Sequence, residues 1–185
     1  MCLIGIAYRT HPQYELVLAA NRDEFHARAA APAAYWVDAP EVYGGRDLTQ
    51  GGGWLALSAR RRLAAVTNVR RMVMPDPQAP SRGKLVADFV RGAQSAASFA
   101  AALKADAARY AGFNLLLWDG AALLYLSNQP DFRCEAVTPG VHGLSNAALD
   151  TPWPKLTRLK QAMQGFSSEA DLFAALADEQ RVPDA

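Results

Sequence analysis

The chain has 185 residues, the length of one globular domain or of one domain with a short appendage. With 51% hydrophobic and 20% charged residues, it has the composition of an ordinary folded protein rather than a disordered one. The 19 Lys and Arg residues balance the 18 Asp and Glu residues, so no global field attracts nucleic acid or an anionic membrane, and we expect neither as a partner.

The chain begins with a predicted β-hairpin. Cys2–Tyr8 is an apolar run of strand length, Glu15–Ala20 is a second, and His11–Gln13 between them has the composition of a turn. The start lacks a basic segment, and Leu3–Tyr8 is too short for the apolar region of a signal peptide. No stretch approaches the about 20 apolar residues of a membrane span. Two cysteines cannot build a disulfide framework, so we expect a cytoplasmic protein without a transmembrane segment.

Cys2 directly follows the initiator Met1, which is normally removed before a residue as small as cysteine. The mature chain would then carry a thiol and a free α-amine on one residue. An α-amine has a pKa of about 8, so part of it is neutral at physiological pH and can accept the thiol proton. The thiolate is the attacking species, and an N-terminal amine is a recognised activator of such a nucleophile. The alternative is that Cys2 is a small buried residue at the start of a strand.

After the first hairpin, groups of predicted strands alternate with groups of predicted helices. A Pro- and Ala-rich loop is expected around Ala29–Pro40, and Arg60–Arg62 and Pro139-Gly140 are expected to be turns. The further predicted strands are Gly53–Ser58, Leu63–Asn68, Phe113–Trp118, Ala121–Ser127, Phe132–Val137 and Val141–Ser145. The predicted helices are one capped by Ser81 and ended by Gly92, one that begins at Ser95 or Ser98, and Lys155–Gln164 and Ser168–Ala177.

This order of elements predicts an antiparallel α+β fold. Strands joined by hairpins and helices gathered in groups are not typical of βαβ repeats. Apolar strands such as Phe113–Trp118 need cover on both faces, and a sandwich of two sheets with helices outside would supply it.

Polar residues stand where several predicted strands end. Asn21-Arg22-Asp23-Glu24 follows the second strand, so a hairpin would place Arg22 or Asp23 near Cys2. An Arg keeps a neighbouring thiol ionised, an Asp can hold a protonated α-amine, and an Asn amide can donate to a developing oxyanion. Asn68 and Asn146 end strands in the same way and would supply further donors. The alternative is a turn with a surface ion pair worth about 0–1 kcal/mol.

The glycine-rich stretch Gly44–Trp54 matches neither a Walker A loop nor a dinucleotide fingerprint. Its glycines would let the backbone turn or approach a ligand closely, or they form a flexible surface loop. The three His residues are scattered and no Cys/His spacing matches a zinc site, so we expect no metal. The short runs Arg60–Arg62 and Arg70-Arg71 lack aromatic residues between them, which argues again against a nucleic acid.

A series of short motifs covers about residues 1–160: Met1-Cys2, Asn21–Phe25, Gly44–Leu48, Gly51–Trp54, Thr67–Arg70, Ser81–Val86, Gly112–Leu115, and Gly143–Asn146 with Leu149–Lys155. Their order resembles the NRDE family, the relatives of Transport and Golgi organisation protein 2. The resemblance implies an N-terminal-nucleophile (Ntn) hydrolase-like fold, an αββα sandwich of two antiparallel sheets flanked by helices. It also implies a single domain over residues 1–185 that lacks the family's C-terminal strands. An open sheet edge of that kind favours a homodimer.

The chain is also distantly similar to the choloylglycine and penicillin V acylase group, in which a mature N-terminal Cys is followed by an Arg and an Asp after the second strand. Carried onto this chain, the resemblance makes Cys2 the candidate nucleophile and Arg22 and Asp23 its thiol and amine partners. It makes Asn68 and Asn146 the candidate oxyanion donors.

Three functional hypotheses follow. The first is an Ntn-type amidohydrolase that uses Cys2, and no cofactor, to cleave the C–N bond of a linear small-molecule amide. The second takes up the family's links to haem trafficking and to acyl-CoA or lipid handling, and is a non-catalytic carrier of haem or acyl-CoA. In that case the segment after the second strand and the glycine-rich loops contact the ligand, through Asn21, Glu24, Arg46, Trp54 and Arg70. The third is a partner-binding domain without a small ligand.

Overall fold

The computed structural model describes residues 2–69, 76 and 78–180 of the chain. Within these residues it contains two antiparallel sheets and four α-helices, so the predicted α+β class with two antiparallel sheets is confirmed. The chain divides into two compact units. We call residues 1–23 with 138–185 the terminal unit, and residues 24–137 the central unit. The single domain over residues 1–185 stays a prediction.

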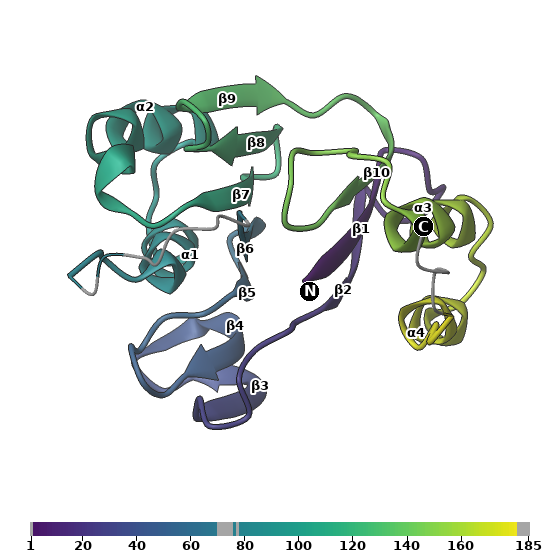
Figure 1. Cartoon of the computed structure of the whole chain (residues 1–185), viewed down its shortest axis with the longest axis horizontal. Helices are drawn as coiled ribbons and strands as arrows, with labels where there is room; N and C mark the ends of the chain where they lie inside the picture. Colours follow the sequence, from purple (N-terminus) through teal and green to yellow (C-terminus); the bar gives the residue numbers. More distant parts are fainter. Residues whose placement is uncertain (1, 70–75, 77, 181–185) are drawn as a thin grey trace. The chain divides into compact units, whose positions relative to one another are not determined.

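The central unit is built on a seven-stranded sheet in which every strand pairs with its neighbour in sequence (Figure 1). Its strands are β3 (Ala30–Trp36), β4 (Ala39–Asp47), β5 (Leu55–Ser58), β6 (Arg62–Asn68), β7 (Phe113–Trp118), β8 (Leu123–Ser127) and β9 (Arg133–Ala136). The turn from β7 to β8 is formed by Asp119-Gly120, a pair typical of a hairpin between two apolar strands. Gly120 adopts a φ of 84°, and the Asp119 carboxylate accepts the N–H groups of Ala121 and Ala122.

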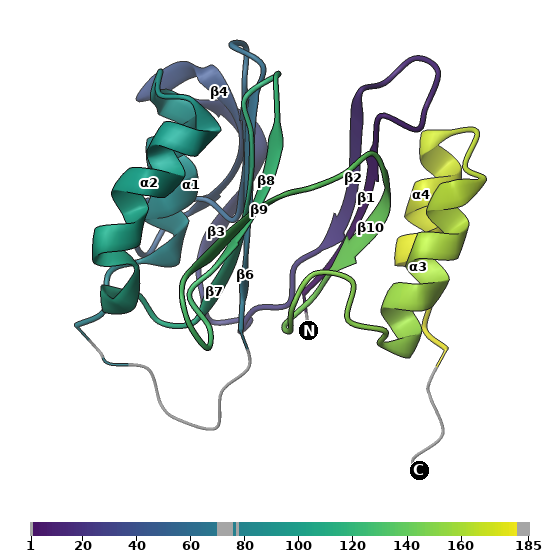
Figure 2. The same ribbon diagram turned by 90° about the horizontal axis from the view of Figure 1, so that it is seen from above.

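Helices α1 (Arg82–Arg91) and α2 (Ala96–Asp106) lie on one face of this sheet, and the short 3₁₀ helix η1 (Ala107–Arg109) follows α2 (Figure 2). The buried face of α1 is the one that helical spacing predicts: Leu85, Val86, Phe89 and Val90. These side chains form one core with residues of the sheet that include Val42, Ala64, Leu115 and Leu117.

The terminal unit has a three-stranded sheet in the order β10-β1-β2, formed by β10 (Gly140–Leu144), β1 (Leu3–Tyr8) and β2 (Leu16–Asn21). β1 and β2 form the predicted hairpin, with Tyr8 opposite Leu16. Helix α3 (Pro154–Gln164) packs against β1 and β10, and α4 (Glu169–Leu176) packs against β2 and α3. Figure 2 shows both helices on the same side of this sheet. β1 is therefore the central strand, with a neighbour on each side.

Two paired glycines bring α3 close to this sheet. Gly5 lies opposite Gly143 across the β1–β10 pair. A Cβ atom on Gly5 would overlap Met163, and one on Gly143 would come within 2.6 Å of Leu156 Cδ1. Helix α3 thus packs directly over backbone, and any side chain at either position would push it away.

The region 29–40 is a pair of strands rather than the predicted loop. β3 runs through it and β4 already begins at Ala39. β3 is an edge strand that is mostly exposed and has an irregular register with β4, and an edge position tolerates Pro32. Trp36 anchors the strand, because its ring is 3% exposed and its Nε1 donates to the Gly44 oxygen at 3.0 Å. The strand was predicted as a loop because its Ala- and Pro-rich composition is not typical of a strand.

The predicted Arg60–Arg62 turn is confirmed for the exposed residues Arg60 and Arg61 and corrected for Arg62. Arg62 is not part of a solvated turn, since it begins β6, is 6% exposed, and donates from Nε to the Phe89 oxygen at 2.9 Å. That contact satisfies a carbonyl in the last turn of α1. The predicted turn Pro139-Gly140 differs in that Gly140 is already the first residue of β10, and the strands before and after it, β9 and β10, belong to different sheets.

The predicted helix starts are confirmed, but their caps differ. Ser95 accepts the Ser98 N–H with its side chain, and Ser168 forms a complete capping box with Asp171. Ser81 occupies the N-cap position of α1, yet its side chain makes no capping hydrogen bond.

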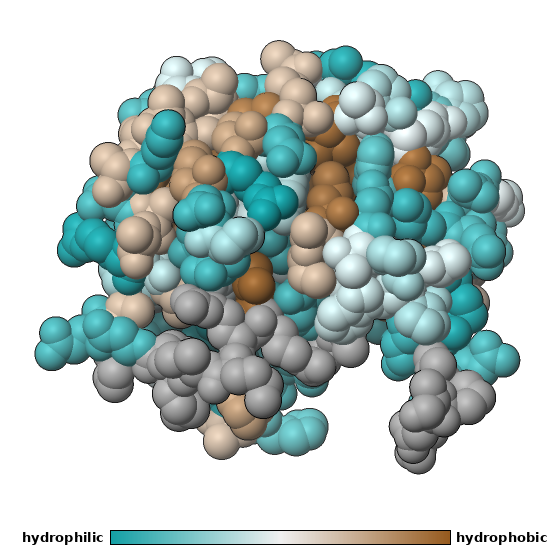
Figure 3. All heavy atoms as spheres, turned by 45° about the horizontal axis from the view of Figure 1, so that its top comes forward, coloured by the Kyte–Doolittle hydropathy of each residue, from teal (hydrophilic) through white to brown (hydrophobic). Residues whose placement is uncertain are grey.

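Hydrophilic and intermediate residues cover most of the face drawn in Figure 3, and strongly hydrophobic residues appear there as small separate groups. Scattered apolar side chains of this kind are ordinary on a protein surface. No helix in the described part of the chain is long and apolar enough to cross a bilayer.

Candidate functional site

Cys2 stands at the end of the central strand of the terminal unit, directly before β1. The register pairs Leu3 with Asn21 of β2 and Ile4 with Leu144 of β10. The residues that follow β2 and β10 therefore flank Cys2 on its two sides. Cys2 itself is buried, with 8% of its surface exposed.

Cys2 makes hydrogen bonds on both sides. On the β10 side, Ser145 Oγ donates to the main-chain oxygen of Cys2 at 2.7 Å. On the β2 side, Cys2 Sγ lies 3.9 Å from the main-chain oxygen of Asp23. The first contact fixes the main chain, and the second is a weak contact that the thiol makes as a donor. The side chain of Cys2 is thus directed toward the chain segment that follows β2.

The structure brings four of the five predicted catalytic residues into this unit. Arg22 and Asp23 follow β2 directly, and Asn146 comes two residues after the end of β10. Together with Cys2, they lie at the same end of the three-stranded sheet, where β1 begins and β2 and β10 end. The fifth residue, Asn68, is the last residue of β6 in the central unit and is exposed.

Asn21 has a structural contact that its sequence context does not reveal. Its Nδ2 donates to the main-chain oxygen of Leu176, the last residue of α4, at 2.7 Å. Carbonyls in the last turn of a helix lack partners within the helix, so this amide satisfies one of them. Asn21 therefore ties the end of β2 to α4.

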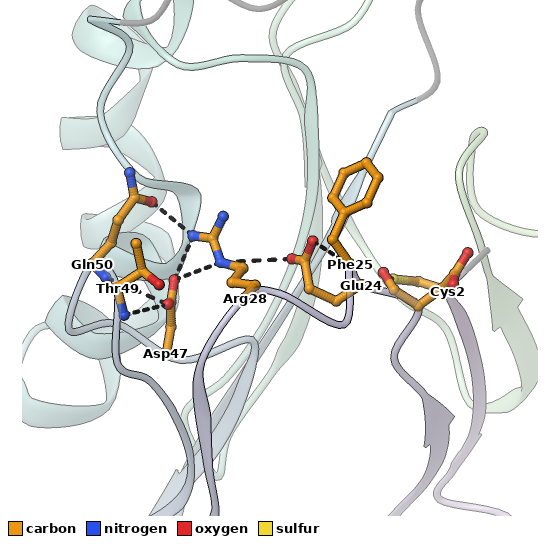
Figure 4. A network of polar contacts seen from close by, with 8 residues as sticks. Cys2, Glu24, Phe25, Arg28, Asp47, Thr49 and Gln50 are labelled. Atoms are coloured by element: carbon orange, nitrogen blue, oxygen red, sulfur yellow. Dashed lines mark hydrogen bonds and ion pairs between the residues drawn. The ribbon is translucent and has the colours of Figure 1, made fainter.

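Glu24 belongs to a charged network in the central unit that centres on Arg28 (Figure 4). Arg28 donates to Asp47 Oδ2 from Nη2 at 2.5 Å and from Nε at 3.2 Å, and its Nε lies 3.7 Å from Glu24 Oε2. Arg28 also donates to Gln50 Oε1 at 3.0 Å. The Asp47 hydrogen bonds raise the pKa of Arg28. Burial alone would raise the pKa of Asp47, but Arg28 and the Thr49 N–H lower it below its ordinary value.

The predicted ligand residues Arg46 and Trp54 both make structural contacts within the central unit. Arg46 forms a two-point ion pair with Asp38 at 2.7 and 3.2 Å, and its guanidinium lies 4.2 Å from the centre of the Trp36 ring. Arg91 from α1 joins the same carboxylate at 2.5 Å. These hydrogen bonds hold the pKa of Asp38 well below its usual range. Trp54 is partly buried against the core between α1 and the sheet. Arg70 lies outside the described residues.

The glycine-rich stretch brings a loop against α1. A Cβ atom on Gly52 would lie 2.5 Å from the Gly83 carbonyl carbon, and the Gly53 N–H donates to the Gly83 oxygen at 3.3 Å. Gly51 adopts a φ of 72°. The close approach that the glycines permit is therefore backbone against backbone, between the loop before β5 and the first turn of α1.

Sequence reasoning missed a charged cluster centred on Asp150 in the terminal unit. Asp150 Oδ2 lies 2.7 Å from His142 Nδ1, and Oδ1 accepts from Lys160 Nζ at 2.6 Å. Oδ1 also accepts the Gly143 N–H at 2.9 Å, while the Asp150 N–H donates to the Gly143 oxygen at 2.8 Å. Burial alone would raise the pKa of Asp150, but the hydrogen bonds from Lys160, His142 and Gly143 lower it. The only signal was the position of Asp150 within the motif Leu149–Lys155.

Among the described residues, no group of three or more His, Cys, Asp or Glu side chains could hold a metal ion. Both cysteines are free thiols, with Cys2 buried and Cys134 exposed on β9. Burial raises the pKa of the Cys134 thiol, and Glu135 adds to the effect. Cys134 is thus an exposed thiol with a raised pKa, and Cys2 can be compared with it.

Comparison with known proteins shows to which family the chain is related. The family model for Transport and Golgi organisation 2 matches residues 1–183. The chain is 38% identical over 173 residues to the Transport and Golgi organization protein 2 homologs of Bos taurus and Homo sapiens, covering 87% of this chain and 62% of each relative. It is 33% identical over 184 residues to Transport and Golgi organization protein 2 of Drosophila melanogaster, covering 90% of this chain and 65% of that protein. The chain therefore spans less than two thirds of the length of these relatives. On this evidence the chain belongs to the Transport and Golgi organisation 2 family.

Proposed function

We propose that the chain is an Ntn-type cysteine amidohydrolase that cleaves the C–N bond of a linear small-molecule amide, with Cys2 as the nucleophile. The observation that carries the proposal is the way Cys2 is held at the end of the central strand. Ser145 fixes its main chain, its thiol faces the segment after β2, and Arg22, Asp23 and Asn146 belong to the neighbouring strand ends. A thiol placed in this way beside a free α-amine is a nucleophile with its own base.

The proposed reaction has two stages. The α-amine of Cys2 takes the thiol proton, and the thiolate attacks the carbonyl carbon, forming a C–S bond and a tetrahedral oxyanion. Collapse of that intermediate breaks the C–N bond, and the α-ammonium gives its proton to the leaving amine. Water then attacks the thioester, which releases the carboxylic acid and returns the thiol. The sum is amide plus water to acid plus amine, so no oxidant, metal or cofactor enters the balance.

The neighbouring residues have distinct roles in this proposal. Arg22 supplies a permanent positive charge that stabilises the thiolate. Asp23 holds the protonated α-amine. Asn146 donates its amide to the oxyanion; removal of such a donor costs about 10²–10³-fold in rate in a well-studied protease.

The first test is the mass of the intact protein, followed by thiol labelling. The proposal requires that Met1 is removed, and then predicts that iodoacetamide modifies Cys2 near neutral pH faster than Cys134, although Cys134 is the exposed thiol. Retention of Met1 in the functional protein would contradict the hydrolase proposal. Equal slow labelling of both thiols would count against activation of Cys2.

A second candidate function is a carrier of haem or of an acyl-CoA-type ligand. One observation favours it: Arg46 and Arg91 share a single carboxylate, Asp38, above the buried Trp36 ring, so two guanidinium groups face one carboxylate. Such a pair suits an anionic ligand group. Titration with haem, followed by the Soret band, tests this candidate against an Arg46→Gln variant. No spectral change on titration would remove haem as the cargo.

The proposal also includes a site of action in the cytoplasm, where free thiols are maintained. Homodimerisation stays part of it as an expectation about sheet edges. Sedimentation of the purified protein at two concentrations separates a monomer from a dimer.

A further inference from the structure

Ser145 connects the end of β10 to Cys2. The two residues are 143 positions apart in sequence, and their hydrogen bond is buried, with Ser145 3% and Cys2 8% exposed. The bond holds the carbonyl oxygen of Cys2, so it restricts rotation of the peptide that follows the nucleophile. The α-amine and the thiol of Cys2 leave the same Cα atom, and rotation there would move both of them.

Ser145 is itself held in place by the contacts between Gly143 and Asp150, which we call the β10 clasp. Two hydrogen bonds of 2.8 and 2.9 Å join these residues, so the loop between them is closed at its base. Lys160 from α3 and His142 from β10 pin the carboxylate of Asp150. The clasp therefore fixes the end of β10 against α3 two residues before Ser145.

The backbone of Asp150 shows that the clasp has a conformational cost. Asp150 adopts a φ of 60°, in the left-handed region that non-glycine residues seldom occupy. Such a conformation persists only where the surrounding contacts determine it. Here those contacts are the four hydrogen bonds of Asp150 to Gly143, His142 and Lys160.

We propose that Ser145 is a positioning residue for Cys2, and that the β10 clasp holds Ser145 in the place where it can act. This inference rests on the proposed hydrolase function. Ser145 acts through the main chain of Cys2 rather than on the acyl group: it aligns the thiol and the α-amine with the acyl carbon. Attack on a carbonyl is sensitive to this alignment, since an error of about 1 Å costs about 10²-fold in rate.

The experiment measures acylation of Cys2 by p-nitrophenyl acetate in a Cys134→Ser background, which leaves Cys2 as the single thiol. A C–S bond forms, the ester C–O bond breaks, and p-nitrophenolate leaves in a burst that absorbance records. We expect Ser145→Ala to slow the burst about 10-fold or more. Ser145→Thr keeps the hydroxyl and is expected to restore the rate to within about threefold of the parent.

Two further measurements separate positioning from a general effect on the fold. Alkylation by iodoacetamide needs no alignment of the amine with an acyl carbon, so we expect Ser145→Ala to change it much less than acylation. Asp150→Asn weakens the clasp, yet Asn tolerates the left-handed conformation, and it is expected to slow the burst in the same direction as Ser145→Ala. Thermal unfolding by circular dichroism confirms that each variant is folded.

The outcomes are distinct. Equal bursts in Ser145→Ala and the parent overturn the positioning role and leave Cys2 as the nucleophile. Loss of acylation together with faster alkylation and a lower melting temperature, without rescue by Ser145→Thr, also overturns it, because the role is then structural. No burst in a parent protein that has lost Met1 overturns the proposed function and this inference with it.

Discussion

The thiol of Cys2 faces a main-chain oxygen, that of Asp23, at 3.9 Å. A carbonyl accepts a hydrogen bond from a protonated thiol and offers nothing to a thiolate. In the proposed mechanism, ionisation therefore depends on the α-amine as base and on a nearby cation. Arg22, directly after β2, is the candidate for that cation.

We predict that Arg22→Gln lowers the alkylation rate of Cys2 near neutral pH by about tenfold, because less of the thiol is ionised without the neighbouring charge. The matched control is Arg9→Gln, which removes an exposed Arg of the same unit that pairs with Glu15. Labelling followed by peptide mass spectrometry reports Cys2 alone. An identical rate in both variants would exclude Arg22 from the activation of the thiol.

Asp150 provides a prediction about pH. The pKa of Asp150 is lowered in the folded protein, so its contribution to stability is present above the unfolded value of about 3.9 and is lost as the pH falls through the folded value. Asp150→Asn should reduce the free energy of unfolding at neutral pH by about 1–2 kcal/mol. It should also flatten the loss of stability on the acid side, as urea unfolding at several pH values would show. A pH profile parallel to that of the parent would mean that the carboxylate is not what holds the clasp.

At the scale of elements, the loop before β5 meets the first turn of α1 through backbone alone. We predict that Gly52→Ala destabilises the protein by about 1–3 kcal/mol, because its Cβ would lie 2.5 Å from the Gly83 carbonyl carbon and backbone has little freedom to move away. Gly45→Ala is the control: its Cβ would meet the Ala31 oxygen at 3.5 Å, an ordinary contact. Similar melting temperatures for the two variants would contradict this account of the loop.

The helix starts give a second prediction at this scale. Ser168→Ala removes a complete capping box from α4 and should cost about 1 kcal/mol. Ser81→Ala, at the N-cap of α1, removes a side chain that makes no capping bond and should cost less than half of that. Thermal denaturation measures both losses of stability. A larger loss in Ser81→Ala than in Ser168→Ala would contradict this difference between the two caps.

At the scale of the whole molecule, periodicity and turn chemistry were sufficient for most elements. The β1–β2 hairpin, the buried face of α1 and the Asp119-Gly120 turn all follow from local sequence. Strand β3 did not, because an exposed edge strand of Ala and Pro has neither apolar alternation nor β-branched residues. Local sequence also could not show that β9 and β10 belong to different sheets, since strand partners are chosen by tertiary contacts.

The same difference between local sequence and tertiary contacts decides which parts of the candidate site could be predicted. The position of Cys2 beside Arg22 and Asp23 could be inferred, because a hairpin fixes which strand ends meet. Ser145 and Asp150 could not, because their roles depend on β10 returning from far along the chain to pair with β1. Arg46 stays a predicted ligand residue, and the sequence could not show that Asp38 and Trp36 also contact its guanidinium.

Peptide mapping after brief treatment with p-nitrophenyl acetate shows whether Cys2 is an N-terminal nucleophile. We expect that the N-terminal peptide begins at Cys2, carries one acetyl group on that residue, and loses the modification in Cys2→Ser. An N-terminal peptide that still begins with Met1, or acetylation of Cys134 to the same extent as Cys2, would contradict it.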